Sequence, residues 1–119
     1  MRGDKLRLGD VIEAIAQIQK HTSSGREKFD NDELIRVWVV HHIQIIGEAL
    51  SQVSDEVRIR YPQVQWAQII AMRNIVVHAY FGVDFEAVWN VVENNLSSLK
   101  THVETMIENL PATDNDEDA

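Results

Sequence analysis

Three side chains that can transfer protons or bind phosphate stand inside an apolar stretch of the chain. The stretch "WAQIIAMRNIVVHAYF", from Trp66 to Phe81, contains Arg73, Asn74 and His78 among mainly apolar residues. On a helical wheel, apolar groups surround the axis, which predicts a helix that is buried or shared with a subunit interface. Burial of polar groups is costly unless each is paired or hydrogen-bonded. The three residues therefore need either structural partners or a function.

The same residues are suited to cleavage of an RNA phosphodiester. The imidazole of His78 could take a proton from a 2′-hydroxyl or protonate the leaving oxygen, because imidazoles ordinarily titrate near neutral pH. Arg73 could hold the phosphate through two hydrogen bonds and stabilise the charge that develops on it. Asn74 lies four residues before His78, on the same helical face, and could hold the imidazole or a phosphate oxygen. This chemistry requires no metal and no cofactor.

The arrangement of these groups on the wheel favours a site shared by two subunits. Arg73 and His78 differ by about 140° around the helix axis, so they cannot lie side by side on one straight helix. A long arginine can still reach into a groove that the imidazole also lines. Two copies of the helix across a two-fold axis would gather these groups in one cleft.

A structural interpretation also stays open from spacing alone. Arg73 would then pair with an acidic neighbour such as Glu48, and His78 would donate a hydrogen bond to a backbone carbonyl. Elsewhere, the adjacent His41 and His42 point about 100° apart on a helix and cannot bind one metal ion in the i, i+4 manner. We expect these two histidines to have a core or interface role.

The remaining aromatic and histidine residues are predicted to be structural. Trp38, Trp66 and Trp89 occupy apolar helical positions, which predicts anchors of the core or of an interface, with base stacking as the alternative. His21 and His102 lie near polar positions and are predicted at the surface.

Apolar spacing and capping residues predict an all-α, antiparallel bundle of four to five helices. Asp30, followed by Glu33, is the predicted N-cap of the second helix, and Ser54 and Asp84 are the predicted N-caps of later helices. The stretch "SSGREKFDN" is predicted to break the chain between the first two helices. The apolar rhythm of the last helix could serve packing within the chain or a dimer seam. The predicted helices are 4–22, 30–53, a short helix in 54–62, 64–81 and 84–110.

Length and composition predict one helical domain with an acidic tail. The chain has 119 residues, enough for one domain over residues 1–110. Residues 111–119 carry half of the formal net charge of −8 and are predicted to be disordered. The chain has no cysteine, and it shows neither an apolar signal segment nor a membrane-spanning stretch. A soluble cytoplasmic protein that does not bind membranes is expected.

The polar residues also form a motif that resembles a known superfamily. Arg73 is separated by four residues from His78, and Tyr80 follows two positions later. This Arg-x4-His-x-Tyr pattern resembles the signature of the HEPN superfamily, and it is most similar to the HepT-like toxins. The segments "IIGEAL" at 45–50 and "YPQVQWAQIIAMRNIVVHAYFGVDFEAVW" at 61–89 extend the resemblance over residues 45–110.

The resemblance implies a homodimeric bundle that acts as a metal-independent ribonuclease toxin of the type VII toxin–antitoxin class. RNA is the implied substrate, with tRNA as a candidate. Arg73 and His78 correspond to the nuclease residues, with Asn74 in support. The implied partner is a nucleotidyltransferase (MntA-like) antitoxin, which silences the toxin by adenylylating Tyr80.

Two other classes of protein stay open from the sequence. The first is a non-catalytic helical partner that binds a nucleotide or docks a nucleotidyltransferase, for which the net acidity of the chain gives some support. The second is a structural bundle in which the polar cluster has all its hydrogen bonds satisfied. Toxicity that depends on His78 would separate the nuclease from both.

Overall fold

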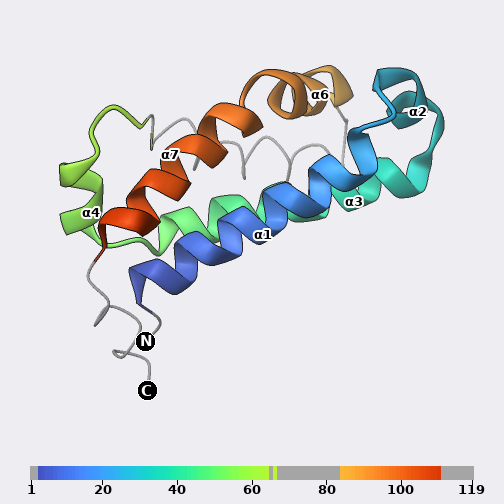
Figure 1. Cartoon of the computed structure of the whole chain (residues 1–119). Coiled ribbons are helices and arrows are strands. Elements are labelled where there is room, and N and C mark those ends of the chain that lie inside the picture. Colours follow the sequence, from blue (N-terminus) through green and yellow to red (C-terminus); the bar gives the residue numbers. More distant parts are fainter. Residues whose placement is uncertain (1–2, 65, 67–83, 111–119) are drawn as a thin grey trace.

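The chain folds into helices that pack side by side (Figure 1). The computed structural model describes residues 3–64, 66 and 84–110. Within these residues every regular element is an α-helix, which confirms the predicted all-α class. None of the described helices is long and apolar enough to cross a membrane. The helices are α1 (Asp4–Thr22), α2 (Arg26–Asn31), α3 (Glu33–Ser51), α4 (Asp55–Arg60), α6 (Phe85–Asn94) and α7 (Leu96–Asn109).

Helices α1 and α3 pack against each other in antiparallel orientation, and hydrogen bonds connect α1 to α3 at one end and to the N-cap of α4 at the other. At one end, the Asp4 carboxylate accepts hydrogen bonds from the backbone N–H of Ser54 at 2.8 Å and from its hydroxyl at 2.6 Å. At the other end, the indole N–H of Trp38 donates to the carbonyl of Gln17 at 3.1 Å. The bounds of α1 match the predicted helix 4–22.

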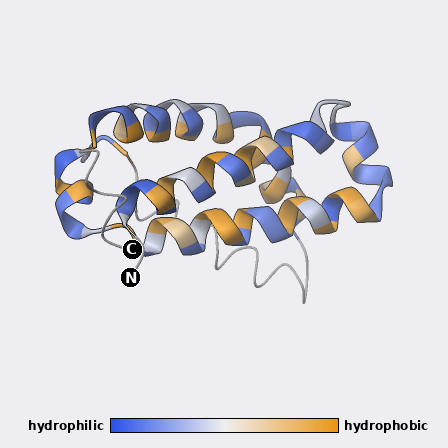
Figure 2. Cartoon of the chain, turned by 60° about the horizontal axis from the view of Figure 1, so that its bottom comes forward, coloured by the Kyte–Doolittle hydropathy of each residue, from blue (hydrophilic) through white to orange (hydrophobic). Residues whose placement is uncertain are grey.

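The core lies between α1, α3 and α7 and is built from buried apolar residues of each. Hydrophobic and hydrophilic residues alternate along these helices (Figure 2). Apolar residues three or four positions apart on α1 and α3 are completely buried, which is the amphipathic pattern that the sequence predicts. Burial of each such side chain contributes about 1.5–3 kcal/mol to the stability of the fold. These residues are Leu8, Val11, Ile15 and Ile18 on α1 and Val39, Ile43, Ile46 and Leu50 on α3.

The predicted single helix over 84–110 is wrong, because the chain breaks into α6 and α7 at Asn95. Asparagine is a poor residue for a helix interior, since its side chain competes for backbone hydrogen bonds. The two helices run in different directions, and α7 packs along α1 (Figure 1). Four apolar residues of α7 are at most 4% exposed, so their rhythm serves packing within the chain; they are Leu96, Leu99, Val103 and Met106.

The chain between α1 and α3 also differs from the prediction. The stretch that was predicted to be irregular contains the short helix α2, which begins after Gly25 in a left-handed conformation (φ 96°). The N-cap of α3 lies two residues later than predicted, at Asp32 and not at Asp30. The Asp32 carboxylate accepts hydrogen bonds from the backbone N–H groups of Leu34 at 3.0 Å and Ile35 at 3.3 Å.

The cap at Asp32 predicts a pH dependence of stability. Hydrogen bonds from Ile35 and Leu34, together with the charge of Lys28, lower the pKa of Asp32 below its ordinary value of 3.8. A lowered pKa in the folded state stabilises the protein fully above the unfolded value, and the contribution disappears as the pH falls through the folded value. The stabilising effect of this carboxylate is therefore expected to decline only below about pH 4.

The variant Asp32→Asn retains a capping oxygen but cannot titrate. Urea midpoints of wild type and variant should differ by a constant amount between about pH 8 and pH 5, and the difference should shrink toward about pH 3. A difference that stays constant down to the lowest pH would contradict the assigned role of Asp32.

Candidate active site

The four residues of the predicted site lie outside the described part of the chain. Arg73, Asn74, His78 and Tyr80 all fall within residues 67–83, as does most of the predicted helix 64–81. The described residues on each side nevertheless show how this range is connected to the bundle. These two connections determine where the predicted site segment enters and leaves the fold.

The segment is entered from α4, whose start agrees with the prediction. The Ser54 hydroxyl accepts a hydrogen bond from the backbone N–H of Val57 at 3.3 Å, which confirms the predicted N-cap. After α4, the side chains of Tyr61 and Val64 are buried at 8% and 3% exposure. The indole N–H of Trp66 donates to the Tyr61 carbonyl at 3.0 Å. The chain is therefore fixed to the bundle immediately before residue 67.

The segment leads into α6, where the predicted cap is also present. The Asp84 carboxylate accepts a hydrogen bond from the backbone N–H of Ala87 at 3.1 Å. The ring of Phe85 packs edge-to-face on Phe29 of α2, with 6.1 Å between centroids. The guanidinium of Arg36 lies 5.3 Å from the centroid of Phe85. Contacts with α2 and the first half of α3 therefore hold the start of α6.

An ion pair adds to the connection between α2 and α6. The guanidinium of Arg26 contacts the carboxylate of Glu86 and also pairs with Asp30 at 3.3 Å. The hydrogen bond to Glu86 is the main reason that the pKa of Arg26 is raised above its ordinary value. Because all three side chains are exposed, solvent screens these attractions.

The two connections lie toward opposite ends of α3 (Figure 1). Arg58 of α4 binds the carbonyls of Leu50 and Ser51, whereas Phe85 meets Arg36. With a rise of about 1.5 Å per residue, these two positions on α3 are roughly 20 Å apart, and a helix over 64–81 would be about 27 Å long. The predicted helix is therefore long enough to join them.

The predicted core role is confirmed for His42, whereas Trp38 lies at the surface of the chain and not in its core. Trp38 is 38% exposed, and its ring contacts the imidazoles of His21 and His42, with centroids 5.2 Å and 4.4 Å away. His42 is 8% exposed, and its Nδ1–H donates to the Trp38 carbonyl at 2.8 Å. His41, which was expected in the core or an interface, is exposed in the chain. With both the ring and the N–H of Trp38 engaged, a packing role is favoured over base stacking.

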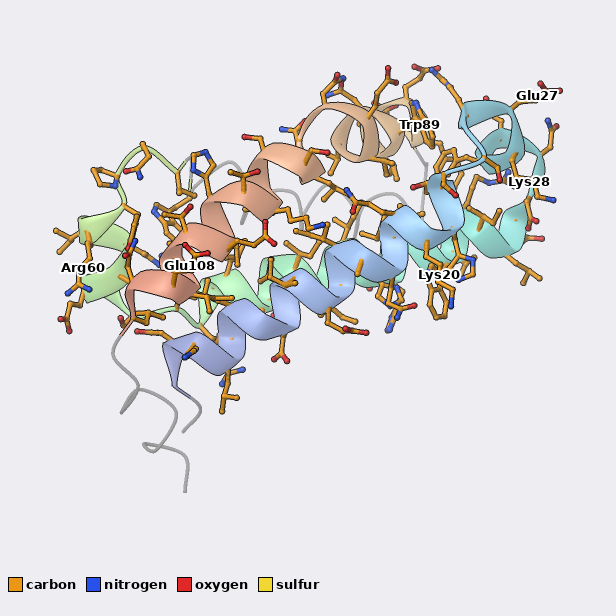
Figure 3. All side chains as sticks on the ribbon, in the orientation of Figure 1. Lys20, Glu27, Lys28, Arg60, Trp89 and Glu108 are labelled. Atoms are coloured by element: carbon orange, nitrogen blue, oxygen red, sulfur yellow. The ribbon has the colours of Figure 1, made fainter. Side chains whose placement is uncertain are left out.

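The other two tryptophans and the remaining histidines are placed as follows. Trp89 is 8% exposed, and its ring lies 5.1 Å from that of Phe29, so its predicted core role is confirmed. Figure 3 shows Trp89 on the side of α6 that faces α2. Trp66 is half-buried against the core. His21 is exposed, as predicted, whereas His102 is half-buried.

The described residues show no metal centre. Within residues 3–64, 66 and 84–110, no group of three or more histidine, aspartate or glutamate side chains is arranged to hold a metal ion. His41 and His42 are adjacent on α3. Their rings meet edge-on, with centroids 5.1 Å apart.

The helical fold and the Arg-x4-His-x-Tyr motif define the class of protein to which the chain belongs. Residues 11–106 match the HepT-like family, whose description is "Ribonuclease HepT-like". This range covers most of the chain and includes Arg73, His78 and Tyr80. The chain therefore belongs to the ribonuclease HepT-like family, which confirms the resemblance inferred from the motif.

Individual relatives match over nearly their whole length. A protein of Methanocaldococcus jannaschii named "Putative RNase MJ1380" is 32% identical over 104 residues, which cover 87% of this chain and 95% of the relative. The "Probable ribonuclease HepT" of Thermococcus cleftensis is 33% identical over 106 residues, covering 88% and 96%. "Putative RNase MJ1216" of M. jannaschii is 30% identical over 114 residues, covering 95% and 94%. No solved structure matches the chain.

Proposed function

We propose that the chain is a metal-independent endoribonuclease that acts in the cytoplasm as the toxin of a toxin–antitoxin pair. The observation that carries this proposal is the family match over residues 11–106, which includes Arg73 and His78 in the Arg-x4-His spacing. Relatives that share about a third of the sequence bear ribonuclease names. Residues 1–110 would act as one domain and pair with a second copy.

In this mechanism the imidazole of His78 accepts the proton of a 2′-hydroxyl, and the 2′-oxygen attacks the adjacent phosphorus. The bond from phosphorus to the 5′-oxygen breaks, and an imidazolium, supplied by the second copy, protonates that oxygen. Arg73 holds the phosphate and stabilises its added charge, while Asn74 orients the imidazole. The products are a 2′,3′-cyclic phosphate and a 5′-hydroxyl, and no step needs a metal ion.

The proposed partner is a nucleotidyltransferase of the MntA-like type that adenylylates Tyr80. Residues 73 and 80 are seven apart and lie nearly on one face of a helix, about two turns from each other. AMP on the phenol of Tyr80 would place a phosphate where Arg73 can bind it in place of RNA. The modification would thereby block the site and neutralise the toxin.

Growth of a host that expresses the chain alone tests the toxin proposal. Wild type is expected to stop growth, whereas His78→Ala, expressed at the same level, should permit it. His41→Ala, at an exposed histidine of α3, is the matched control and should remain toxic. If wild type and His78→Ala are equally harmless, the nuclease proposal fails and a non-catalytic docking partner becomes the better explanation.

The mode of neutralisation predicts a mass change at one residue. Incubation with the nucleotidyltransferase and ATP should add one or more AMP units to Tyr80 and abolish cleavage of RNA. Tyr80→Phe should gain no mass. The other tyrosine of the chain, Tyr61, is buried beside α4, and the variant Tyr61→Phe should still be modified at Tyr80. Peptide mapping that finds AMP at any other residue rejects this mode of control.

A further inference from the structure

Arg58 joins three parts of the chain at the point where the motif segment begins. Its Nη2 donates hydrogen bonds to the carbonyls of Leu50 at 3.0 Å and Ser51 at 2.9 Å. These carbonyls belong to the last turn of α3, where carbonyl groups lack partners within the helix. The guanidinium carbon also lies 5.9 Å from the ring centroid of Trp66, within the range of a cation–π contact.

The environment of the guanidinium makes this contact specific to arginine. Nε of Arg58 is shielded from solvent and has no hydrogen-bond partner among the described residues. A partly desolvated cation is attracted more strongly to an aromatic face than an exposed one. A planar guanidinium can bind carbonyls at its edge while its face lies over a ring, which the ammonium of lysine cannot do in the same way.

Trp66 is held from a second side as well. Its indole N–H donates to the Tyr61 carbonyl at 3.0 Å, and its backbone N–H donates to the Val64 carbonyl at 2.9 Å. The side chain is half-buried against the core. Both the position of the ring and its orientation are therefore fixed by α4 and the residues that follow it.

The position of Trp66 in the sequence relates it to the motif. Trp66, Arg73 and Tyr80 are spaced seven residues apart. In the predicted helix 64–81, two residues seven positions apart differ by only about 20° around the helix axis, so all three lie on nearly the same face. A ring fixed at residue 66 would therefore set the rotation of the helix about its axis, and with it the direction in which residues 73 and 80 point.

We propose that Arg58 and Trp66 form a clamp that sets the rotation of the predicted helix 64–81 about its axis. Arg58 would then be a positioning residue for RNA cleavage. This inference rests on the proposed nuclease function. Arg58 does not need to touch RNA in this role. It holds the ring of Trp66 between the end of α3 and Tyr61, and through this ring it would orient the predicted helix 64–81 so that Arg73 and His78 face the phosphate.

Two variants and a matched control test the clamp. Arg58→Lys keeps the charge but loses the planar group, and Trp66→Phe keeps a ring but loses the N–H that binds Tyr61. Arg60→Lys makes the same change two residues away, at a side chain that points away from the bundle at the far end of α4 (Figure 3). Among the described residues, Arg60 pairs with Glu56 at 3.5 Å, and both side chains are exposed.

The kinetic constants for a defined RNA should separate positioning from binding and from folding. Arg58→Lys and Trp66→Phe should lower kcat by roughly 10–100-fold, because small displacements of reacting groups carry penalties of this size, while KM changes little. Arg60→Lys should leave both constants unchanged. Wild-type kcat in both clamp variants would overturn the proposal. So would a decrease in kcat that occurs only in variants that urea denaturation shows to be partly unfolded under the assay conditions.

A spectroscopic readout keeps the clamp testable if wild type proves inert toward RNA. The chain has five histidines, and the imidazole proton resonances of His78 and His21 can be compared by NMR. In both clamp variants the imidazole resonance of His78 should shift. The resonance of His21, which contacts Trp38 in the first half of α3, should not. An unshifted His78 in folded clamp variants rejects the clamp, whereas an inert wild type with shifted His78 rejects only the nuclease proposal.

Discussion

Replacement of His78 by alanine is expected to lower the rate of RNA cleavage by roughly 10²–10⁴-fold, the usual contribution of a general acid or base. Replacement of Arg73 by alanine should cost about 10²–10³-fold, because charge on the phosphate then loses its main stabilising group. The measurement is kcat/KM for a labelled RNA with purified protein. Both variants should retain the helical spectrum and urea midpoint of wild type.

The control for these substitutions is His41→Ala, which removes an exposed imidazole from α3. Its kcat/KM should remain within about twofold of wild type, because surface substitutions rarely disturb a fold. Equal losses in His41→Ala and His78→Ala would indicate a general effect of histidine removal. Cleavage at the wild-type rate by His78→Ala would assign the chemistry to other residues.

Replacement of Phe29 by alanine is expected to lower the free energy of unfolding by about 3–5 kcal/mol. The Phe29 side chain is completely buried, and its ring contacts those of Phe85 and Trp89, with centroids 6.1 Å and 5.1 Å away. It is the buried residue that joins α2 to α6, so its loss would leave a cavity between these helices. Urea denaturation monitored by circular dichroism measures the effect.

Two further variants show whether the cavity is the cause of this loss. Phe29→Leu fills much of the same space and should lose clearly less stability than Phe29→Ala. Val37→Ala removes apolar atoms from a side chain that is 50% exposed, and its free energy of unfolding should change by about 0.5 kcal/mol or less. A midpoint for Phe29→Ala near that of Val37→Ala would contradict the packing role of Phe29.

The long helices could be predicted because their stability comes from regular apolar faces. The apolar residues of α1 recur every three or four positions, and its observed bounds equal the predicted ones. Helix α2 was missed because it is only six residues long and buries one side chain, Phe29, so it has no periodic signal. The start of α3 was misplaced because Asp30 and Asp32 are both acceptable caps. In the structure Asp30 lies within α2, where it pairs with Arg26, and Asp32 caps α3.

The break at Asn95 could not be read from hydrophobic spacing, because the spacing continues across it. Val88 and Leu96 are both buried on the sides of α6 and α7 that face the rest of the bundle. The chain changes direction at Asn95, but the apolar residues of α6 and of α7 both still face the core. The spacing of apolar residues in the sequence therefore does not change at this point. Only the asparagine pair at 94 and 95 hints at the break.

The candidate site was predicted from residue chemistry and a motif, and its surroundings were only partly foreseen. The caps at Ser54 and Asp84, on either side of the motif segment, were predicted correctly because capping depends on local sequence. The contacts of Arg58 with Leu50, Ser51 and Trp66 were not predicted. They join residues on different elements, and an arginine in the last turn of a short helix carries no local signal of its partners.

The most direct test of the proposed mechanism compares two substrates that differ by one oxygen. One is an RNA oligonucleotide that wild type cleaves, and the other carries a 2′-deoxy sugar at the cleaved position, both in excess chelator. We predict rapid cleavage of the first to a 2′,3′-cyclic phosphate and none at the deoxy linkage. Cleavage at the deoxy linkage, or activity that stops with chelator and returns with a divalent metal, would contradict a mechanism in which His78 and Arg73 act through the 2′-hydroxyl.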